Sequence, residues 1–366
     1  MRVRFNDLYN DNKKIEKKLL SSFKKMIKKS SFIGGKEVQR FEENFKNINN
    51  SKYCVSCANG SDALVIAIKA LGIKPGDEII TTSLSWIATS AAIKMSGGKV
   101  VFCDVERDGF NIDIESIKKK ISRKTVGIIP VHLYGHPANM LQIMKIAKKF
   151  KLWVIEDCAQ SHLAKIDNKI VGNFGDFGAF SFFPAKNLGA LGDAGCLVTN
   201  NKKLANRARL LATHGGKGKH LLEGINSRLD SIQASFLNLK IKNLKKNTFK
   251  RIKNAKIYDE LFKSNSNIKF FKNKKNIQNV FHQYTILVQK RNELKKYLST
   301  KKIETNVYYS NLLPDYPAYN YIKNKDHFIN GRKKIKKILS LPINENLNID
   351  QIKFVAKTIN NFYNKF

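Results

Sequence analysis

The sequence predicts an α/β protein, with a large domain built on a mostly parallel sheet and a smaller C-terminal α+β domain. Three observations lead to this prediction. The chain has 366 residues, of which 42% are hydrophobic, enough for a large and a small core. Strand-like and helical segments alternate through its first half, as they do around parallel sheets. Near residue 236 the composition shifts to a long lysine-rich helical pattern.

The elements of the large domain follow from the spacing of apolar residues. Residues 1–50 are expected to form a helix and an approach loop, and residues 53–57 resemble a strand. Leu64, Ile68 and Leu71 then recur at helical spacing. The predicted order continues with a helix at 61–71, a strand at 78–82, a helix at 86–96, strands at 100–104 and 126–131, a helix at 138–150 and a strand at 153–156. Ligand chemistry is expected at the carboxyl ends of these strands.

The second half is predicted to enter the smaller domain through a long helix at 237–263. A strand at 284–288, a helix near 291–300, a strand at 303–309 and a final helix from about residue 349 follow. We therefore divide the chain into an N-terminal segment and large domain at 1–236, and a bridging helix and small domain at 237–366.

One lysine stands in an unusual setting. Lys186 lies in a short loop between an apolar run and several glycines, in Ser-Phe-Phe-Pro-Ala-Lys-Asn-Leu-Gly. Upstream, Asp157 closes an apolar strand, where an unpaired charge is costly. A strand-end turn or a helix cap would also explain Asp157 alone. Together, a lysine that can form a Schiff base and a carboxylate that can keep a pyridine nitrogen protonated suit pyridoxal 5'-phosphate.

A third segment could hold the phosphate of such a cofactor. Asn59-Gly60-Ser61-Asp62 leads from the strand at 53–57 into a helical pattern. Glycine permits close backbone approach, and the free N–H groups at a helix start bind phosphate. An ordinary helix cap is the alternative, because Asn, Ser and Asp all cap helices.

These motifs together resemble the DegT/DnrJ/EryC1/StrS family of sugar aminotransferases, which depend on pyridoxal 5'-phosphate and have the aspartate-aminotransferase-like fold type I. The resemblance covers nearly the whole chain, and it is the combination of motifs that is specific. The matching segments are 5–8, 32–38 with Phe41-Glu42, 59–64, 130–135, 156–160, the lysine loop, 224–234 and 340–343.

The resemblance implies a role for each residue of the cofactor site. Lys186 would be the catalytic residue, which forms the Schiff base and moves the proton. Asp157 would pair with the pyridine nitrogen, and Gln160 would lie near the cofactor ring. Trp86 would stack on the ring, although a core tryptophan at a helix start is the alternative. The phosphate would be held by Gly60, Ser61 and Ser181.

The resemblance also implies a homodimer with shared active sites. Asn226 would contact the cofactor and Arg228 the substrate, both in the site of the neighbouring subunit. A surface turn followed by a helix is the alternative for this segment. Tyr308 and Tyr309 would line the sugar pocket. There the chain reads Tyr-Tyr-Ser where relatives have His-Tyr-Pro, which leaves the sugar open.

The function implied is transfer of an amino group from L-glutamate to a keto group of a nucleoside-diphosphate hexose, in amino-sugar biosynthesis for surface polysaccharides such as the O-antigen of lipopolysaccharide. The segments 187–193 and 226–230 look like the branch acting on 3-keto sugars, with a 4-keto sugar as the alternative. Members of this family that remove a hydroxyl instead carry histidine where Lys186 stands. The nucleotide, whether dTDP, UDP or GDP, is left open.

Composition bears on the remaining classes of function. No apolar run reaches about 18 residues and no signal core begins the chain, so we expect a cytoplasmic protein without membrane spans. The five cysteines and seven histidines show no metal-site spacing, and we expect no metal. The net charge of +38 raises the alternative of a nucleic-acid binder, but the lysines are spread along the whole chain, and we expect no nucleic acid as partner.

Overall fold

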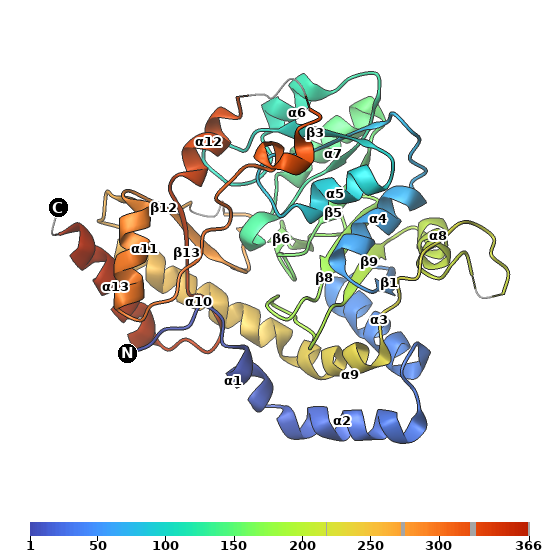
Figure 1. Cartoon of the computed structure of the whole chain (residues 1–366), viewed down its shortest axis with the longest axis horizontal. Coiled ribbons are helices and arrows are strands. Elements are labelled where there is room, and N and C mark those ends of the chain that lie inside the picture. The colour runs from blue at the N-terminus through green and yellow to red at the C-terminus, as the bar shows by residue number, and fades with distance from the viewer. Residues whose placement is uncertain (217, 272–274, 323–326, 365–366) are drawn as a thin grey trace.

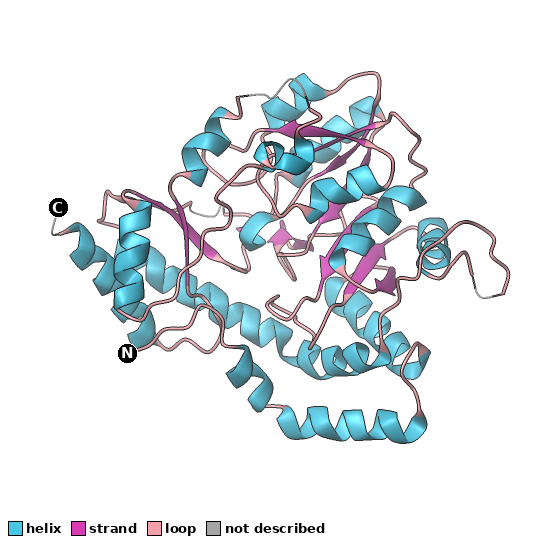
Figure 2. Ribbon diagram, in the orientation of Figure 1, coloured by secondary structure: helices cyan, strands magenta, loops and turns pink. Residues whose placement is uncertain are grey.

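Short runs of β-branched and aromatic residues form a central sheet. The computed structural model describes residues 1–216, 218–271, 275–322 and 327–364 (Figures 1 and 2). Its large sheet has the strand order β1-β9-β8-β5-β4-β2-β3. From β3 to β8 all neighbours are parallel, whereas β9 is antiparallel to both β8 and β1. The strands are β1 (Tyr53–Cys57), β2 (Glu78–Thr82), β3 (Lys99–Cys103), β4 (Thr125–Ile129), β5 (Trp153–Asp157), β8 (Phe177–Ser181) and β9 (Gly195–Thr199). The predicted α/β fold with a mostly parallel sheet is confirmed.

Helices cover both faces of this sheet because its strands are apolar on both faces. In β5, Val154 packs into the core beneath α7, while the next residue, Ile155, packs into the core beneath α4. Both side chains are fully buried. The covering helices are α3 (Gly35–Asn49), α4 (Gly60–Ala70), α5 (Ala88–Met95), α6 (Ile114–Lys120), α7 (Met140–Phe150) and α8 (Lys202–Ala212).

A second core lies around a three-stranded sheet in the C-terminal part. Val3 joins this core from the other end of the chain and pairs with Ile303. The elements here are α10 (Leu244–Phe262), β10 (Ile268–Lys269), β12 (Tyr284–Val288), α11 (Arg291–Thr300), β13 (Ile338–Leu341) and α13 (Ile349–Tyr363). Helix α12 (Ile329–Ile335) instead packs against the core of the large sheet through Ile335. The division of the chain at 236/237 stays a prediction.

The remaining elements connect these parts. A small sheet of β11 (Ile277–Gln278), β6 (Lys165–Ile166) and β7 (Lys169–Ile170) links the C-terminal segment to the loop after β5. Helix α2 (Glu16–Lys29) runs beneath α9 (Ser231–Lys240) in the view of Figure 1, and α1 (Leu8–Lys13) lies to the left of α9. No helix of the described residues is long and apolar enough to cross a membrane.

Two predicted elements were wrong. The helix expected at 237–263 is two helices, α9 and α10, joined by a 3-10 turn at Ile241–Asn243. Leu237, Ile241 and Leu244 keep helical spacing across this turn, so periodicity alone could not reveal it. The strand expected at 303–309 makes only two isolated bridges, from Ile303 to Val3 and from Asn306 to Ser340 in β13. Strands β8 and β9, which flank the lysine loop, were missing from the predicted order.

A buried ion pair ties α10 to the segment after β13. Arg251 and Glu345 are 2.7 Å apart, with side chains only 7% and 9% exposed. Arg251→Met should therefore lower the free energy of unfolding by about 3–5 kcal/mol, because the carboxylate stays buried without its cation. Urea unfolding at a fixed protein concentration measures this loss. Arg2→Met is the control, since Arg2 pairs with Glu304 in solvent, and it should cost less than about 1 kcal/mol. Equal losses in the two variants would contradict the argument.

Candidate active site

The topology brings Asp157 and Lys186 to the same edge of the sheet. Asp157 is the last residue of β5, and the adjacent parallel strand β8 ends at Ser181, five residues before Lys186. The loop after β8 is tightly folded. The N–H of Lys186 donates to the carbonyl of Phe183 at 2.8 Å, and the N–H of Ala190 donates to Phe182 at 2.7 Å. The two groups singled out from the sequence are therefore held by neighbouring strands.

Asp157 is a buried carboxyl group with two donors. The Thr89 hydroxyl donates to its Oδ2 at 2.8 Å, and the N–H of Ala159 donates to its Oδ1 at 3.1 Å. Burial raises the pKa of Asp157, and these hydrogen bonds and the charge of Lys186 oppose that rise. Thr89 was not singled out from the sequence, although it follows Trp86 by one helical turn at the start of α5.

Lys186 has an amine that loses its proton easily. Burial lowers the pKa of Lys186 to about 8, while the attraction of Asp157 works in the opposite direction. A lysine in a model peptide titrates near about 10.4. The amine is therefore partly neutral near physiological pH, as a nucleophile or proton carrier requires.

The start of α4 lies against the end of β8. Asn59 caps α4, its side chain accepting the N–H of Asp62 at 2.8 Å. A Cβ on Gly60 would lie 2.6 Å from the Cβ of Ser181, so only glycine lets the two backbones approach this closely. The first N–H groups of a helix lack partners within the helix. Gly60 thus lies directly against Ser181, and the Asn59 cap considered as the alternative is present. Phosphate binding by Gly60, Ser61 and Ser181 stays a prediction.

A ring of hydrogen bonds joins Gln160 to the tyrosine pair. The side chain of Gln160 accepts the N–H of Tyr134 at 2.6 Å and donates to the Tyr309 hydroxyl at 3.3 Å. The hydroxyl of Tyr134 in turn donates to the carbonyl of Tyr308. The ring of Tyr309 lies 6.0 Å from that of Trp86, which is 60% exposed. Trp86 is therefore not a core residue, and Tyr134 is a member of this group that sequence reasoning missed.

Asn226 and Arg228 lie on the surface. Both side chains are exposed, and among the described residues neither has a recorded hydrogen bond to Lys186 or Asp157. Between them, the buried Ser227 accepts the N–H of Ala58 at 3.1 Å and donates to Asp62 at 2.7 Å. Ser227 therefore anchors this segment to the approach of α4 and leaves its two neighbours facing outward.

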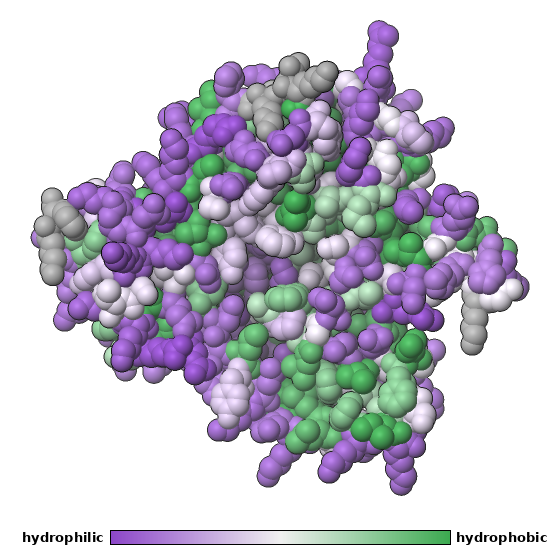
Figure 3. Space-filling view, in the orientation of Figure 1, coloured by the Kyte–Doolittle hydropathy of each residue, from purple (hydrophilic) through white to green (hydrophobic). Residues whose placement is uncertain are grey.

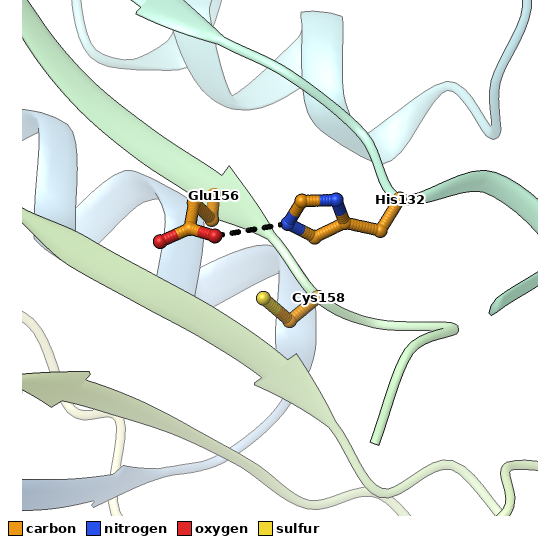
Figure 4. Close-up of side chains that lie close together, drawn as sticks. All are labelled: His132, Glu156 and Cys158. Atoms are coloured by element: carbon orange, nitrogen blue, oxygen red, sulfur yellow. Dashed lines mark hydrogen bonds and ion pairs between the residues drawn. The ribbon is translucent and has the colours of Figure 1, made fainter. Parts of the chain in front are cut away.

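A buried cluster of His132, Glu156 and Cys158 has the residue types of a metal site (Figure 4). Its donor atoms are already engaged. His132 accepts the N–H of Ala138 at 2.9 Å through Nδ1, so Nε2 carries the proton and donates to Glu156 at 3.0 Å. The backbone N–H groups that donate to Glu156, at 2.7–2.9 Å, come from Gly172, Phe174 and Gly175. The cluster therefore fastens the loop before β8 to β5 rather than offering free ligands.

The lowered pKa of Lys186 can be tested on the cofactor-free protein. It would be mixed with pyridoxal 5'-phosphate at a series of pH values, reduced with borohydride and digested. Labelling of the Lys186 peptide should rise with a midpoint near pH 8, because only the neutral amine attacks an aldehyde. Asp157→Asn should move the midpoint to lower pH, since it removes the attraction that favours the charged amine. A Lys186 midpoint equal to that of exposed lysines in the same digest would contradict the assignment.

Comparison with known proteins places this geometry in a family. The chain matches the model of the DegT/DnrJ/EryC1/StrS aminotransferase family over residues 13–360. It is 38% identical, over 100% of both chains, to the pleiotropic regulatory protein of Geobacillus stearothermophilus. It is 35% identical, over 98% of this chain and 100% of the other, to the UDP-2-acetamido-2-deoxy-3-oxo-D-glucuronate aminotransferase of Pseudomonas aeruginosa. The crystal structure of Streptomyces venezuelae DesV in complex with a ketimine intermediate aligns with a TM-score of 0.96, at 31% identity over 99% of this chain and 98% of that one. The chain therefore belongs to the DegT/DnrJ/EryC1/StrS aminotransferase family.

Proposed function

We propose that this chain is a pyridoxal 5'-phosphate-dependent nucleotide-sugar aminotransferase. It moves an amino group from L-glutamate to the keto group, at C3, of a nucleoside-diphosphate hexose in amino-sugar biosynthesis. The observation that carries the proposal is the pairing of Lys186, whose pKa burial lowers to about 8, with the buried Asp157 at the edge of the sheet. Ser181, which ends the strand before Lys186 and next to that of Asp157, lies against the start of α4, where a phosphate would be held.

The residues of this site fit the cofactor. Gly60, Ser61 and Ser181 would hold its phosphate, and Trp86 would cover its ring. Asp157 would face the ring nitrogen. Its carboxylate is held in place by two hydrogen-bond donors, and its negative charge would favour the protonated pyridine. When bound, the cofactor supplies an aldehyde that takes up amino groups and a ring that accepts electrons.

The chain's own residues then position the substrate and move the proton. Lys186 would bind the aldehyde covalently at rest and, once released by an incoming amine, would carry a proton at its Nζ. The lowered pKa of Lys186 serves both tasks, since the amine must accept and return a proton near neutral pH. Gln160 and Tyr309 are held to each other, and Tyr134 ties them to Tyr308. This arrangement would hold the side chains of the sugar pocket in a fixed position relative to the cofactor.

The position of the keto group follows from similarity to relatives. The Pseudomonas aeruginosa relative is named for a 3-oxo sugar, which supports C3 for this chain. A 4-keto sugar is the alternative, because the pocket includes the unusual Tyr308-Tyr309-Ser310 segment. Roles in surface polysaccharides such as O-antigen and a cytoplasmic location stay predictions. Nucleic-acid binding stays a distant alternative that rests on net charge alone.

The proposed partner is a second copy of the chain. Trp86, and Phe183 within the lysine loop, are 60% and 52% exposed, so a single chain leaves its site open to solvent. An apolar surface also lies over α2 and the segment after it, at the bottom of Figure 3. Its exposed residues are Leu20, Phe23, Ile27, Phe32 and Ile33. A two-fold dimer would cover such surfaces and let Asn226 and Arg228 reach the neighbouring site.

A panel of keto sugars tests the proposed function. dTDP-, UDP- and GDP-hexoses with the ketone at C3 or at C4 would be incubated with L-glutamate, and NMR would locate the new amino group. We expect amination at C3. Lys186→Ala should fall below about a hundredth of the wild-type rate, because positioned proton transfer alone contributes about 10²–10⁴-fold. Amination at C4 alone would refute the C3 assignment, and no amination of any sugar would refute the aminotransferase.

Shared active sites can be tested by mixing two inactive proteins. Lys186→Ala and Arg228→Ala should each lose activity, and exchange of their subunits should restore part of it. In a mixed dimer, one site has both its own lysine and its partner's arginine. Light scattering or native mass spectrometry would verify that exchange took place. A mixture that exchanges subunits and stays inactive would show that each site is built within one chain.

A further inference from the structure

A cavity of about 250 Å³ adjoins the lysine loop on the side of α10. One wall is the loop itself, residues 184–189, which includes Lys186. The other walls are the N-terminal segment at 6–15, the residues from 240 to 251 and the pair at 344–345. The volume of the cavity suits one polar part of a ligand rather than a whole nucleotide sugar.

The carboxylates in these walls are already engaged. Asp7 accepts hydrogen bonds from Arg4 and Asn10, at 3.2 and 2.6 Å. Asp11 accepts one from Asn346 at 2.6 Å. Glu345 is paired with Arg251 and also accepts from Asn247 at 3.2 Å. Each of these carboxylates therefore already accepts a hydrogen bond from another side chain of the protein.

Two of the cations in the walls have no such partner. Arg251 is held by Glu345, Lys240 donates to Asn12 at 3.1 Å, and Lys14 donates to Asn346. Lys246 and Lys250 are exposed, and no hydrogen bond or ion pair is recorded for either within the part of the chain that the structure describes. Besides Lys186 itself, the wall thus presents two lysines that have no recorded partner among the described residues, next to the lysine loop.

The spacing of these two lysines suits neighbouring phosphates. Lys246 and Lys250 stand four residues apart on α10, so they lie on one face, with Cβ atoms about 5–6 Å apart. Lysine binds phosphate as a flexible point charge, which suits a group whose oxygens are distributed around two phosphorus atoms. Asn243 and Asn247 line the cavity on the same face; the amide of Asn247 already donates to Glu345, and that of Asn243 adds a further donor.

We infer that this cavity, through Lys246 and Lys250, binds the diphosphate of the nucleotide-sugar substrate. The inference rests on the proposed function, because a keto group that reacts beside Lys186 brings the diphosphate with it. The diphosphate is attached to the anomeric carbon C1, and the keto group is proposed at C3 of the same sugar ring. The diphosphate therefore lies no more than the width of a sugar ring from the reacting carbon. The two lysines therefore fix the position of the bound sugar relative to Lys186, and they take no part in moving the proton.

The test compares two double variants of the cofactor-loaded protein. Lys246→Ala/Lys250→Ala removes the two charges of the cavity. Lys245→Ala/Lys253→Ala removes two exposed lysines from the same helix that do not line the cavity, with the same change in net charge. Isothermal calorimetry would measure the binding of inorganic pyrophosphate and of UDP, dTDP and GDP. We expect the cavity variant to bind pyrophosphate and the preferred nucleotide about tenfold more weakly, and the control to change less than about twofold.

Kinetics separate this inference from the proposed function. In the cavity variant the KM for the keto sugar should rise by about tenfold, while kcat stays unchanged. The yellow colour of the bound cofactor, which should fade when L-glutamate donates its amino group, should fade as in the wild type. Equal weakening in both double variants, or an unchanged Kd for pyrophosphate in the cavity variant, would overturn the inference. A wild-type protein whose colour does not respond to L-glutamate would overturn the proposed function instead, and the pyrophosphate result would be judged separately.

Discussion

Two adjacent buried carboxyl groups at the end of β5 determine how the site is built. Successive residues of a strand point to opposite faces of the sheet, so Glu156 and Asp157 enter different environments. Glu156 accepts hydrogen bonds from three backbone N–H groups and from His132, and it fastens the loop that leads into β8. Among the described residues, Asp157 accepts hydrogen bonds from Thr89 and Ala159, and it attracts the charge of Lys186. One carboxylate thus supports the backbone that carries the lysine, while its neighbour supplies the charge that the lysine needs.

The consequences of this arrangement reach the C-terminal part of the chain. The segment at 279–283 lies between the two loops of the site. Val280 and Gln283 donate to the carbonyls of Gly135 and Tyr134, and His282 bonds to Asn187, the residue after Lys186. Burial and the charge of Lys186 lower the pKa of His282, which favours the neutral imidazole. The position of the lysine loop therefore depends on contacts with residues almost a hundred positions away along the chain.

Contacts between distant segments also explain why the strand predicted at 303–309 does not form at Tyr308 and Tyr309. The strand predicted at 303–309 was expected to extend through Tyr308 and Tyr309, but the carbonyl of Tyr308 accepts a hydrogen bond from Tyr134 and the hydroxyl of Tyr309 accepts one from Gln160. A strand that continued to Tyr309 would not bring these side chains to the edge where Asp157 and Lys186 meet. The hydrogen bonds that end the predicted strand before Tyr308 are therefore the same ones that place Tyr308 and Tyr309 at the site.

The sequence by itself determined the alternation of strands and helices, the family resemblance and the separate identities of Lys186, Asp157 and Gly60. It could do so because apolar periodicity, a charge at the end of an apolar strand and a glycine before a helix are local signals. Only the tertiary structure decided that Gly60 meets Ser181, that Trp86 is exposed and that Tyr134 joins Gln160 to the tyrosine pair. It also decided that Glu156 and His132 bond to each other, and that the helix predicted at 237–263 breaks in two. These features depend on hydrogen bonds and packing between segments far apart in the chain, and no local pattern records which segments will meet.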